Sequence, residues 1–104
     1  MDIYKVDITP MALSDLHEIF SYISKTLSSE QTAKNLMREI DKAISSLNEM
    51  PYRHSLSLDE TLRDKGYRRI LVKNYVILFL INENEKTVTV TRAFHGSMKY
   101  SRYI

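Results

Sequence analysis

The sequence predicts an α+β fold in which a helical hairpin packs on an antiparallel β-sheet. Two stretches on either side of residue 28 carry apolar residues three and four positions apart, which is typical of amphipathic helices. A later stretch, residues 67–94, is rich in β-branched and aromatic residues and predicts three successive strands. All 104 residues are expected to form one domain, because a chain of this length has enough apolar surface for one core.

A short strand is expected first, from Ile3 to Ile8. Apolar side chains alternate there with Lys5 and Asp7, which is the period-two pattern of a half-buried strand. Thr9 then offers an N-cap hydroxyl, and Pro10 stands at the first helical position, where its missing N–H costs nothing. A helix is therefore predicted to begin at Pro10.

Two helices are expected to bury one apolar stripe each, until Pro51 ends the pattern. The stripes are Leu13, Leu16, Phe20, Ile23 and Leu27 in the first helix, and Ala33, Leu36, Met37, Ile40, Ile44 and Leu47 in the second. Ser28, with Gln31 three residues later, fits a capping box for the second helix. The connection is short, so the helices should be antiparallel and cover the same face of the sheet.

The three later strands are predicted at residues 67–72, 75–81 and 87–94. A two-residue break at Lys73-Asn74 and a polar turn at residues 82–85 join them, so they should form an antiparallel meander. Residues 51–66 are expected to form a polar loop with at most a short turn of helix.

The composition argues against several classes of site. The chain has no cysteine, which excludes disulfides and thiolate chemistry. His17, His54 and His95 show no metal-ligand spacing, and two glycines are too few for a phosphate-binding loop, so no metal or cofactor is expected. No apolar run is long enough to span a membrane and no secretory signal is apparent, which predicts a cytoplasmic protein.

Positive charge gathers in the second half of the chain, although the net charge is only +2. The residues concerned are Arg63, Lys65, Arg68, Arg69 and Lys73, then Arg92, Lys99 and Arg102. Such a surface can meet phosphate, an acidic protein segment or only water.

Arg92 shares the parity of Val90 and Phe94, so it is expected to point toward the apolar face of the last strand. A buried guanidinium needs partners. An ion pair with a helix carboxylate such as Glu39 or Asp41, or a bulge that turns Arg92 outward, is one interpretation. A positive charge presented at the mouth of the sheet is the other.

Several runs together resemble the RelE/ParE toxin superfamily. After the helical hairpin come Gly66-Tyr67-Arg68-Arg69, a strand with aromatic residues at Tyr75 and Phe79, a polar turn and a closing Phe94-His95-Gly96 run. The resemblance spans nearly the whole chain. It implies a growth-inhibiting toxin of a type II toxin–antitoxin system, of the kind called plasmid stabilization proteins, which a cognate antitoxin silences in a hetero-oligomer.

The superfamily has two branches, one that cuts messenger RNA on the ribosome and one, ParE, that poisons DNA gyrase. The resemblance to the RNA-cleaving branch would require an arginine after the middle-strand aromatic residue, where this chain has Val76. The run His95-Gly96-Ser97-Met98 resembles ParE instead, although Lys99-Tyr100 departs from it. We therefore predict an inhibitor of DNA gyrase. The expected target-binding residues are Arg92, His95, Ser97, Met98, Lys99, Tyr100, Arg102 and Tyr103.

Two alternatives stay open, and with them the question of whether the chain is an enzyme. A metal-independent endoribonuclease acting on the ribosome would use His95 for proton transfer and Arg68, Arg69 and Arg92 to hold the phosphate. An inactive homologue would serve only as an antitoxin partner or co-repressor. In each case an acidic, partly disordered antitoxin is expected to fold onto the chain. Its expected contacts are Leu16, Phe20, Ile23, Arg63 and Arg69.

Overall fold

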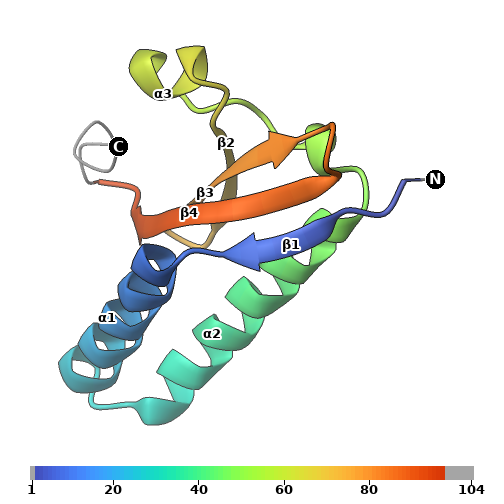
Figure 1. Ribbon diagram of the computed structural model, residues 1–104. Coiled ribbons are helices and arrows are strands. Elements are labelled where there is room, and N and C mark those ends of the chain that lie inside the picture. Colours follow the sequence, from blue (N-terminus) through green and yellow to red (C-terminus); the bar gives the residue numbers. More distant parts are fainter. Residues whose placement is uncertain (1, 98–104) are drawn as a thin grey trace.

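The computed structural model describes residues 2–97, in which a helical hairpin packs on one face of a four-stranded sheet (Figure 1). The elements are β1 (Lys5–Ile8), α1 (Pro10–Thr26), α2 (Glu30–Ser45), the single-turn helices η1 (Ser46–Asn48) and η2 (Pro51–Arg53), α3 (Glu60–Asp64), β2 (Arg68–Val72), β3 (Tyr75–Asn82) and β4 (Thr87–His95). The predicted α+β architecture is confirmed. Within the described part of the chain, no helix is long and apolar enough to cross a membrane.

The sheet has the strand order β1-β4-β3-β2. β2, β3 and β4 form the antiparallel meander that the sequence predicts. β1 instead pairs with β4 in parallel, with Lys5 opposite Thr87 and Ile8 opposite Val90. The sheet is therefore mixed rather than wholly antiparallel, because the two helices carry the chain across one face between β1 and the meander.

A β-bulge interrupts β4 at Thr91, which the register between β3 and β4 skips. Before the bulge, Val90 faces the helices and is fully buried. After the bulge, Ala93 packs with that same core, whereas Phe94 packs on the opposite face of the sheet. The prediction that Phe94 shares the face of Val90 is therefore wrong, because the inserted residue reverses the alternation.

α1 begins where the sequence predicts. The Ala12 N–H donates to the Thr9 hydroxyl at 3.1 Å, and Pro10 occupies the first turn. This cap fixes the start of α1 directly after β1.

The buried face of α1 differs from the predicted stripe. Ala12, Asp15 and Ile19 are buried, whereas Leu13 and Leu27 keep about half of their surface exposed. The predicted stripe consists of large apolar side chains and includes neither Ala12 nor Asp15. In the structure a small alanine and a paired carboxylate face the sheet.

α2 buries the predicted residues Ala33, Leu36, Ile40 and Ile44. Its N-cap is Ser29, one residue later than predicted; its hydroxyl accepts the N–H of Thr32 at 3.1 Å. The preceding serine adopts a positive φ of 49° and makes the turn between the helices.

The face of the sheet opposite the hairpin is covered by α3. Leu62 of α3 is fully buried against Val76, Leu78 and Phe94. The predicted loop at residues 51–66 thus contains a short helix, as expected, but it also supplies a core residue. β3 is consequently buried on both of its faces.

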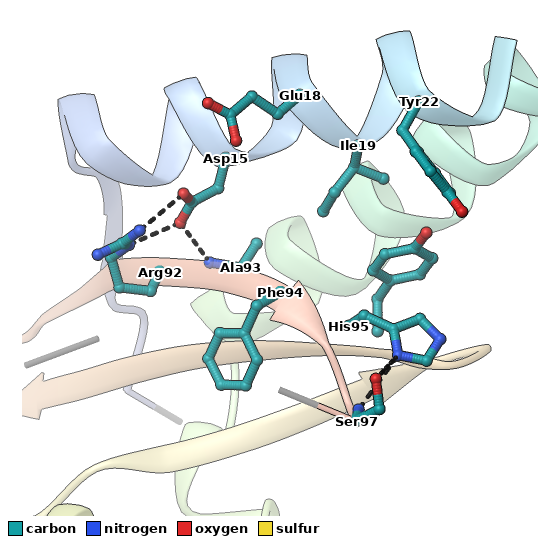
Figure 2. Close-up of a pocket in the computed structure, with 10 residues that line it drawn as sticks. Asp15, Glu18, Ile19, Tyr22, Arg92, Ala93, Phe94, His95 and Ser97 are labelled. Carbon is teal, nitrogen blue, oxygen red and sulfur yellow. Dashed lines mark hydrogen bonds and ion pairs between the residues drawn. The ribbon is translucent and has the colours of Figure 1, made fainter. Parts of the chain in front are cut away.

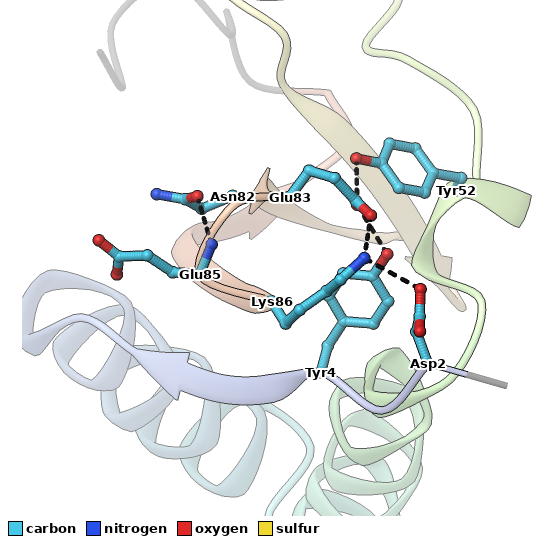
Figure 3. Close-up of polar contacts among 7 residues, drawn as sticks. All are labelled: Asp2, Tyr4, Tyr52, Asn82, Glu83, Glu85 and Lys86. Atoms are coloured by element: carbon cyan, nitrogen blue, oxygen red, sulfur yellow. Dashed lines mark hydrogen bonds and ion pairs between the residues drawn. The ribbon is translucent and has the colours of Figure 1, made fainter.

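A polar cluster closes the turn between β3 and β4 (Figure 3). One oxygen of Glu83 accepts hydrogen bonds from the hydroxyls of Tyr4, at 2.7 Å, and Tyr52, at 2.8 Å. Lys86 donates to the other Glu83 oxygen and, at 2.9 Å, to Asp2. We call these five residues the turn cluster. It ties the N-terminal segment and the η2 loop to the β3–β4 turn.

The turn cluster shifts the protonation of its members. Hydrogen bonds from Lys86, Tyr4 and Tyr52 lower the pKa of Glu83 to about 2. The same bonds to Glu83 raise the pKa of both tyrosines and of Lys86. Glu83 is therefore ionised and Lys86 charged at any pH near neutrality.

Candidate functional site

A pocket of about 540 Å³ opens between α1 and the end of β4 (Figure 2). Its lining comes from α1, from the first residue of β3 and from the end of β4 with the residues after it. These residues are Asp15, Glu18, Ile19, Tyr22, Tyr75, Arg92, Ala93, Phe94, His95 and Ser97. We call it the β4-end pocket. It lies at the opposite end of β4 from the turn cluster.

One wall of the pocket is an ion pair between β4 and α1. Arg92 Nε lies 2.7 Å from Asp15 Oδ2, and Arg92 Nη2 lies 2.9 Å from Asp15 Oδ1. The two side chains are only 17% and 11% exposed, so this two-pronged contact is largely shielded from water. Of the interpretations left open for Arg92, the ion pair with a helix carboxylate is observed, although not with Glu39 or Asp41. Its partner is Asp15, whereas Glu39 pairs with Lys73 at 3.8 Å.

Asp15 also replaces a missing strand neighbour of β4. β1 ends at Ile8 opposite Val90, so β4 has no strand beside it on that side from there onward. The Thr9 hydroxyl donates to the Thr91 carbonyl at 3.0 Å, and the Ala93 N–H donates to Asp15 Oδ2 at 2.9 Å. The start of α1 thereby satisfies backbone groups that would otherwise be left without partners.

His95 is held by Ser97 at the mouth of the pocket. The Ser97 backbone N–H lies 3.1 Å from His95 Nδ1, and the Ser97 hydroxyl lies 2.8 Å from the same atom. A backbone N–H can only donate, so Nδ1 accepts and the neutral ring carries its proton on Nε2. The ring meets Tyr75 edge to face, with centroids 5.4 Å apart. Because Ser97 occupies Nδ1, Nε2 is the ring nitrogen left for contact with another molecule.

Gly96 lies where two backbone segments approach closely. Its N–H donates to the Asn74 carbonyl at 2.7 Å, and a Cβ at Gly96 would lie 3.3 Å from that oxygen. This backbone hydrogen bond joins the end of β4 to the β2–β3 turn, and a larger residue at position 96 would crowd the Asn74 carbonyl.

Two tyrosines that were not among the expected site residues, Tyr22 and Tyr75, complete the pocket. Tyr22 is 62% exposed and Tyr75 is 8% exposed, and Figure 2 shows the Tyr22 side chain extending from α1 toward the sheet. Burial, and then the nearby Tyr22, raise the pKa of Tyr75, so its hydroxyl stays protonated. Neither hydroxyl has a hydrogen-bond partner among residues 2–97. With His95 Nε2–H they are donors available to a bound molecule.

The four residues expected for RNA cleavage are not brought together. Arg92 and His95 line the β4-end pocket. Arg68 donates to the His54 carbonyl at 2.7 Å and stacks 5.2 Å from the Tyr52 ring centroid, so it braces the η2 loop. Arg69 lines a different, smaller pocket.

The expected antitoxin contacts fall on separate surfaces. Leu16 and Phe20 line a recess of about 390 Å³ between α1 and α2, which also holds Met37. Ile23 lines another recess of about 380 Å³, next to Tyr75. Arg63 is exposed on α3 and Arg69 is half-buried on β2. The target-binding residues Met98, Lys99, Tyr100, Arg102 and Tyr103 lie outside the described residues.

No group of three or more histidines, cysteines or acidic residues within residues 2–97 could hold a metal ion.

A family model described as the ParE toxin of type II toxin–antitoxin system, parDE, matches residues 6–100. The chain belongs to the ParE toxin family. It is thus a type II toxin–antitoxin toxin of the wider RelE/ParE superfamily. Comparison with curated proteins gives no significant match.

Solved structures share the fold of this ParE family member at low sequence identity. The chromosomal ParDE toxin–antitoxin system from P. aeruginosa matches at 16% identity with a TM-score of 0.73, covering 89% of this chain and 96% of that chain. The toxin–antitoxin complex RelBE2 from Mycobacterium tuberculosis matches at 23% identity with a TM-score of 0.63, over 91% and 93% of the two chains. A mutant of the E. coli toxin RelE in the free state matches at 15% identity with a TM-score of 0.61, over 97% and 94%. Both branches of the superfamily therefore have this architecture.

Proposed function

We propose that this ParE-family toxin inhibits DNA gyrase and that a cognate antitoxin neutralises it. The observation that carries the choice of gyrase is the position of Val76. Its side chain is fully buried among Leu62, Leu78 and Phe94. The RNA-cleaving branch would need a cationic group here to stabilise phosphate charge in the transition state. This chain offers an apolar core residue instead.

The chemistry of the β4-end pocket also favours binding over bond cleavage. Nε2–H of His95 and the hydroxyls of Tyr22 and Tyr75 are neutral donors beside aromatic rings. The Arg92 charge is balanced by Asp15, and the pocket rim carries the carboxylate of Glu18. Such a surface suits the carbonyl and amide groups of a protein better than a polyanionic RNA backbone.

We infer that the target-facing region extends from this pocket into the C-terminal segment. Arg92, His95 and Ser97 belong to its described part. Met98, Lys99, Tyr100, Arg102 and Tyr103 would continue it. Acting on gyrase would place the toxin in the cytoplasm, where it would inhibit growth and, carried on a plasmid, stabilise that plasmid.

The antitoxin would cover the apolar recesses of the helical hairpin in a hetero-oligomer. Leu13 is 48% exposed beside the recess that Leu16, Phe20 and Met37 line, so apolar surface is available to a partner there. The P. aeruginosa and M. tuberculosis structures that match this fold are a toxin–antitoxin system and a toxin–antitoxin complex. Co-expression with the neighbouring reading frame should give a stable complex, and failure to co-purify at low salt would count against this partner.

A supercoiling assay tests the proposed target. The purified chain, incubated with gyrase, ATP and relaxed plasmid, should block supercoiling or accumulate cleaved plasmid. Gyrase that stays fully active at a large molar excess of the chain would refute the proposal.

A ribosome-dependent endoribonuclease is the second candidate, because Arg92 and His95 do share one pocket and RelE shares the fold. Primer extension on translated messages after induction would then give cuts in phase with codons. His95→Ala would lower the cleavage rate by about 10²-fold if His95 moved a proton. Expression without any growth defect would instead indicate an inactive homologue that serves as an antitoxin partner or co-repressor.

A further inference from the structure

The β4-end pocket carries an excess of negative charge. Among the described residues that line it, three are charged: Asp15, Glu18 and Arg92. His95 accepts the Ser97 N–H at Nδ1, so its ring is neutral in this arrangement. Two carboxylates therefore face one guanidinium, although the chain as a whole has a net charge of +2. The pocket is acidic in a basic protein.

Glu18 supplies the negative charge that is not balanced. Arg92 binds both oxygens of Asp15, at 2.7 and 2.9 Å. The Glu18 side chain is exposed and makes no hydrogen bond or ion pair with any residue from 2 to 97. It follows Asp15 by three residues on α1, so the two carboxylates are neighbours on one face of the helix and repel each other. A cation placed beside Glu18 would relieve this repulsion.

Two tyrosines share the pocket lining with this carboxylate. Tyr22 lies four residues after Glu18, one further turn along α1, and Tyr75 begins β3. The face of a tyrosine ring attracts a cation, most strongly where water is partly excluded. Apolar Ile19 and Ala93 line the same pocket and suit the aliphatic stem of a long cationic side chain.

The turn cluster at the other end of β4 shows how this chain holds a cation with the same residue types (Figure 3). There, Lys86 donates to the Glu83 carboxylate, and its Nζ lies 5.3 Å from the centroid of the Tyr4 ring. Tyr52, which also bonds to Glu83, is the second tyrosine. A glutamate and two tyrosines thus accompany an ammonium group that the chain itself supplies. In the β4-end pocket a glutamate and two tyrosines are present, but no lysine from the described part of the chain lines it.

We propose that the β4-end pocket binds the cationic side chain of an arginine or lysine presented by a partner protein, with Glu18 as its counter-ion and Tyr22 and Tyr75 as its aromatic wall. The pocket volume of about 540 Å³ leaves room for such a side chain and part of its backbone. The His95 Nε2–H group is placed to donate to a carbonyl of the same partner. The inference rests on the proposed function, which assigns this pocket to the target, and it names the chemical group that the target would present.

A ligand titration tests the charge preference without gyrase or antitoxin. The probe is Nα-acetyl-L-arginine N-methylamide, and the matched control is Nα-acetyl-L-citrulline N-methylamide, which has nearly the same shape without the charge. Two-dimensional ¹H–¹⁵N spectra of the full ¹⁵N-labelled chain, at constant ionic strength, should show shifts of the Glu18, Tyr22 and Ala93 amides with the arginine probe. The citrulline probe should bind about tenfold more weakly, because it forms no ion pair. Equal binding of the two probes, or shifts confined to other parts of the chain, would overturn the proposal.

A free polyamine has the same cationic chemistry as these side chains, so putrescine forms a third arm of the titration. It lacks the amide groups that the arginine probe would place against His95 at the mouth of the pocket. We therefore expect putrescine to bind more weakly than the arginine probe. Equal or tighter binding of putrescine would overturn the assignment of the pocket to a protein side chain.

Substitution of Glu18 tests the counter-ion. Glu18→Gln should weaken binding of the arginine probe about tenfold, because the ion pair is lost. Glu85→Gln is the matched control: it removes the same charge from an exposed position in the β3–β4 turn and should bind the probe as wild type does. Equal affinities of the two variants would contradict the role of Glu18.

Substitution of Tyr22 tests the aromatic wall. Tyr22→Leu removes the ring and should weaken binding of the arginine probe, whereas Tyr22→Phe keeps a ring face and should bind nearly as well as wild type. Tyr22 is exposed, so both variants should fold. Equal losses in the two variants, or no loss in Tyr22→Leu, would contradict a contact between the cation and the ring.

The titration and the supercoiling assay can fail separately. A chain that prefers the arginine probe but leaves gyrase active would refute the proposed target and keep the cation site. A chain that inhibits gyrase but binds the arginine and citrulline probes equally would refute only the cation site.

Discussion

Each end of β4 has a carboxylate that binds one cationic side chain and at least one neutral hydrogen-bond donor. At the β3–β4 turn, Glu83 binds Lys86 and two tyrosine hydroxyls. At the other end, Asp15 binds Arg92 and a backbone N–H. In the turn cluster both tyrosine hydroxyls donate hydrogen bonds to the Glu83 carboxylate. In the β4-end pocket the hydroxyls of Tyr22 and Tyr75 have no hydrogen-bond partner among residues 2–97, which supports our proposal that this end of β4 binds another molecule.

The two carboxylates also differ in their exposure to water, and this difference sets their energetic weight. The Asp15 and Arg92 side chains are 11% and 17% exposed, whereas those of Glu83 and Lys86 are 49% and 39% exposed. An exposed pair contributes little because water and salt screen it. Removing one partner of a buried pair leaves a charge that has lost both water and its partner. The pocket end should therefore be the more sensitive to substitution.

Asp15→Ala should have the largest effect on stability. It removes the carboxylate that faces Arg92 and the acceptor of the Ala93 N–H, so the free energy of unfolding should fall by about 3–5 kcal/mol. Urea denaturation measures it. Glu18→Ala is the matched control on the same helix and pocket, and because Glu18 is exposed it should change stability by about 0.5 kcal/mol or less. Similar losses of stability in the two variants would contradict the claim that the buried ion pair makes the pocket end of β4 sensitive to substitution.

Thr9→Ala should have the next largest effect. It removes the N-cap of α1 and the hydrogen bond to the Thr91 carbonyl, for a loss of about 1–2 kcal/mol. Ser29→Ala removes the α2 cap alone, so the difference between the two variants in thermal or urea unfolding reports the contact with β4. Equal losses would mean that this contact contributes nothing to the stability of the pocket end.

Glu83→Gln should have the smallest effect, and it should depend on pH. The pKa of Glu83 is lowered from 4.5 to about 2 in the fold, so its contribution is complete above about pH 4.5 and disappears as the pH falls toward 2. Urea midpoints of wild type and Glu83→Gln should therefore differ above pH 5 and converge near pH 2. Salt at 1 M should narrow the gap, since the cluster is exposed. A gap that widens in acid would contradict the assigned network.

The sequence predicted most of the fold because its main patterns are local. Alternation predicted the strand that ends at Ile8, the two-residue break at Lys73-Asn74 separated two of the later strands, and Thr9-Pro10 predicted the start of α1. A bulge beside Arg92 was only one of the interpretations that the sequence left open, because a single inserted residue leaves the local pattern of β4 unchanged while reversing which side Phe94 faces.

The candidate site was predicted only in part, for a related physical reason. His95 and Ser97 are neighbours in the sequence, so their motif was visible. Asp15 is 77 residues from Arg92 and lies on a helix that carries other surface charges, so only the folded chain identifies it as the partner. Tyr22 and Tyr75 join the pocket through the same long-range packing of α1 on the sheet.

The most direct test of the account compares both ends of β4 in one gyrase supercoiling assay. Wild type, His95→Ala and Glu83→Gln are titrated against gyrase and relaxed plasmid, after their folding has been checked by circular dichroism. We predict that Glu83→Gln inhibits at the wild-type concentration and that His95→Ala needs about tenfold more protein, the loss expected for one hydrogen-bonding contact at an interface. Equal potency of His95→Ala and wild type, or loss of inhibition in Glu83→Gln, would contradict the assignment of the β4-end pocket as the target-facing end.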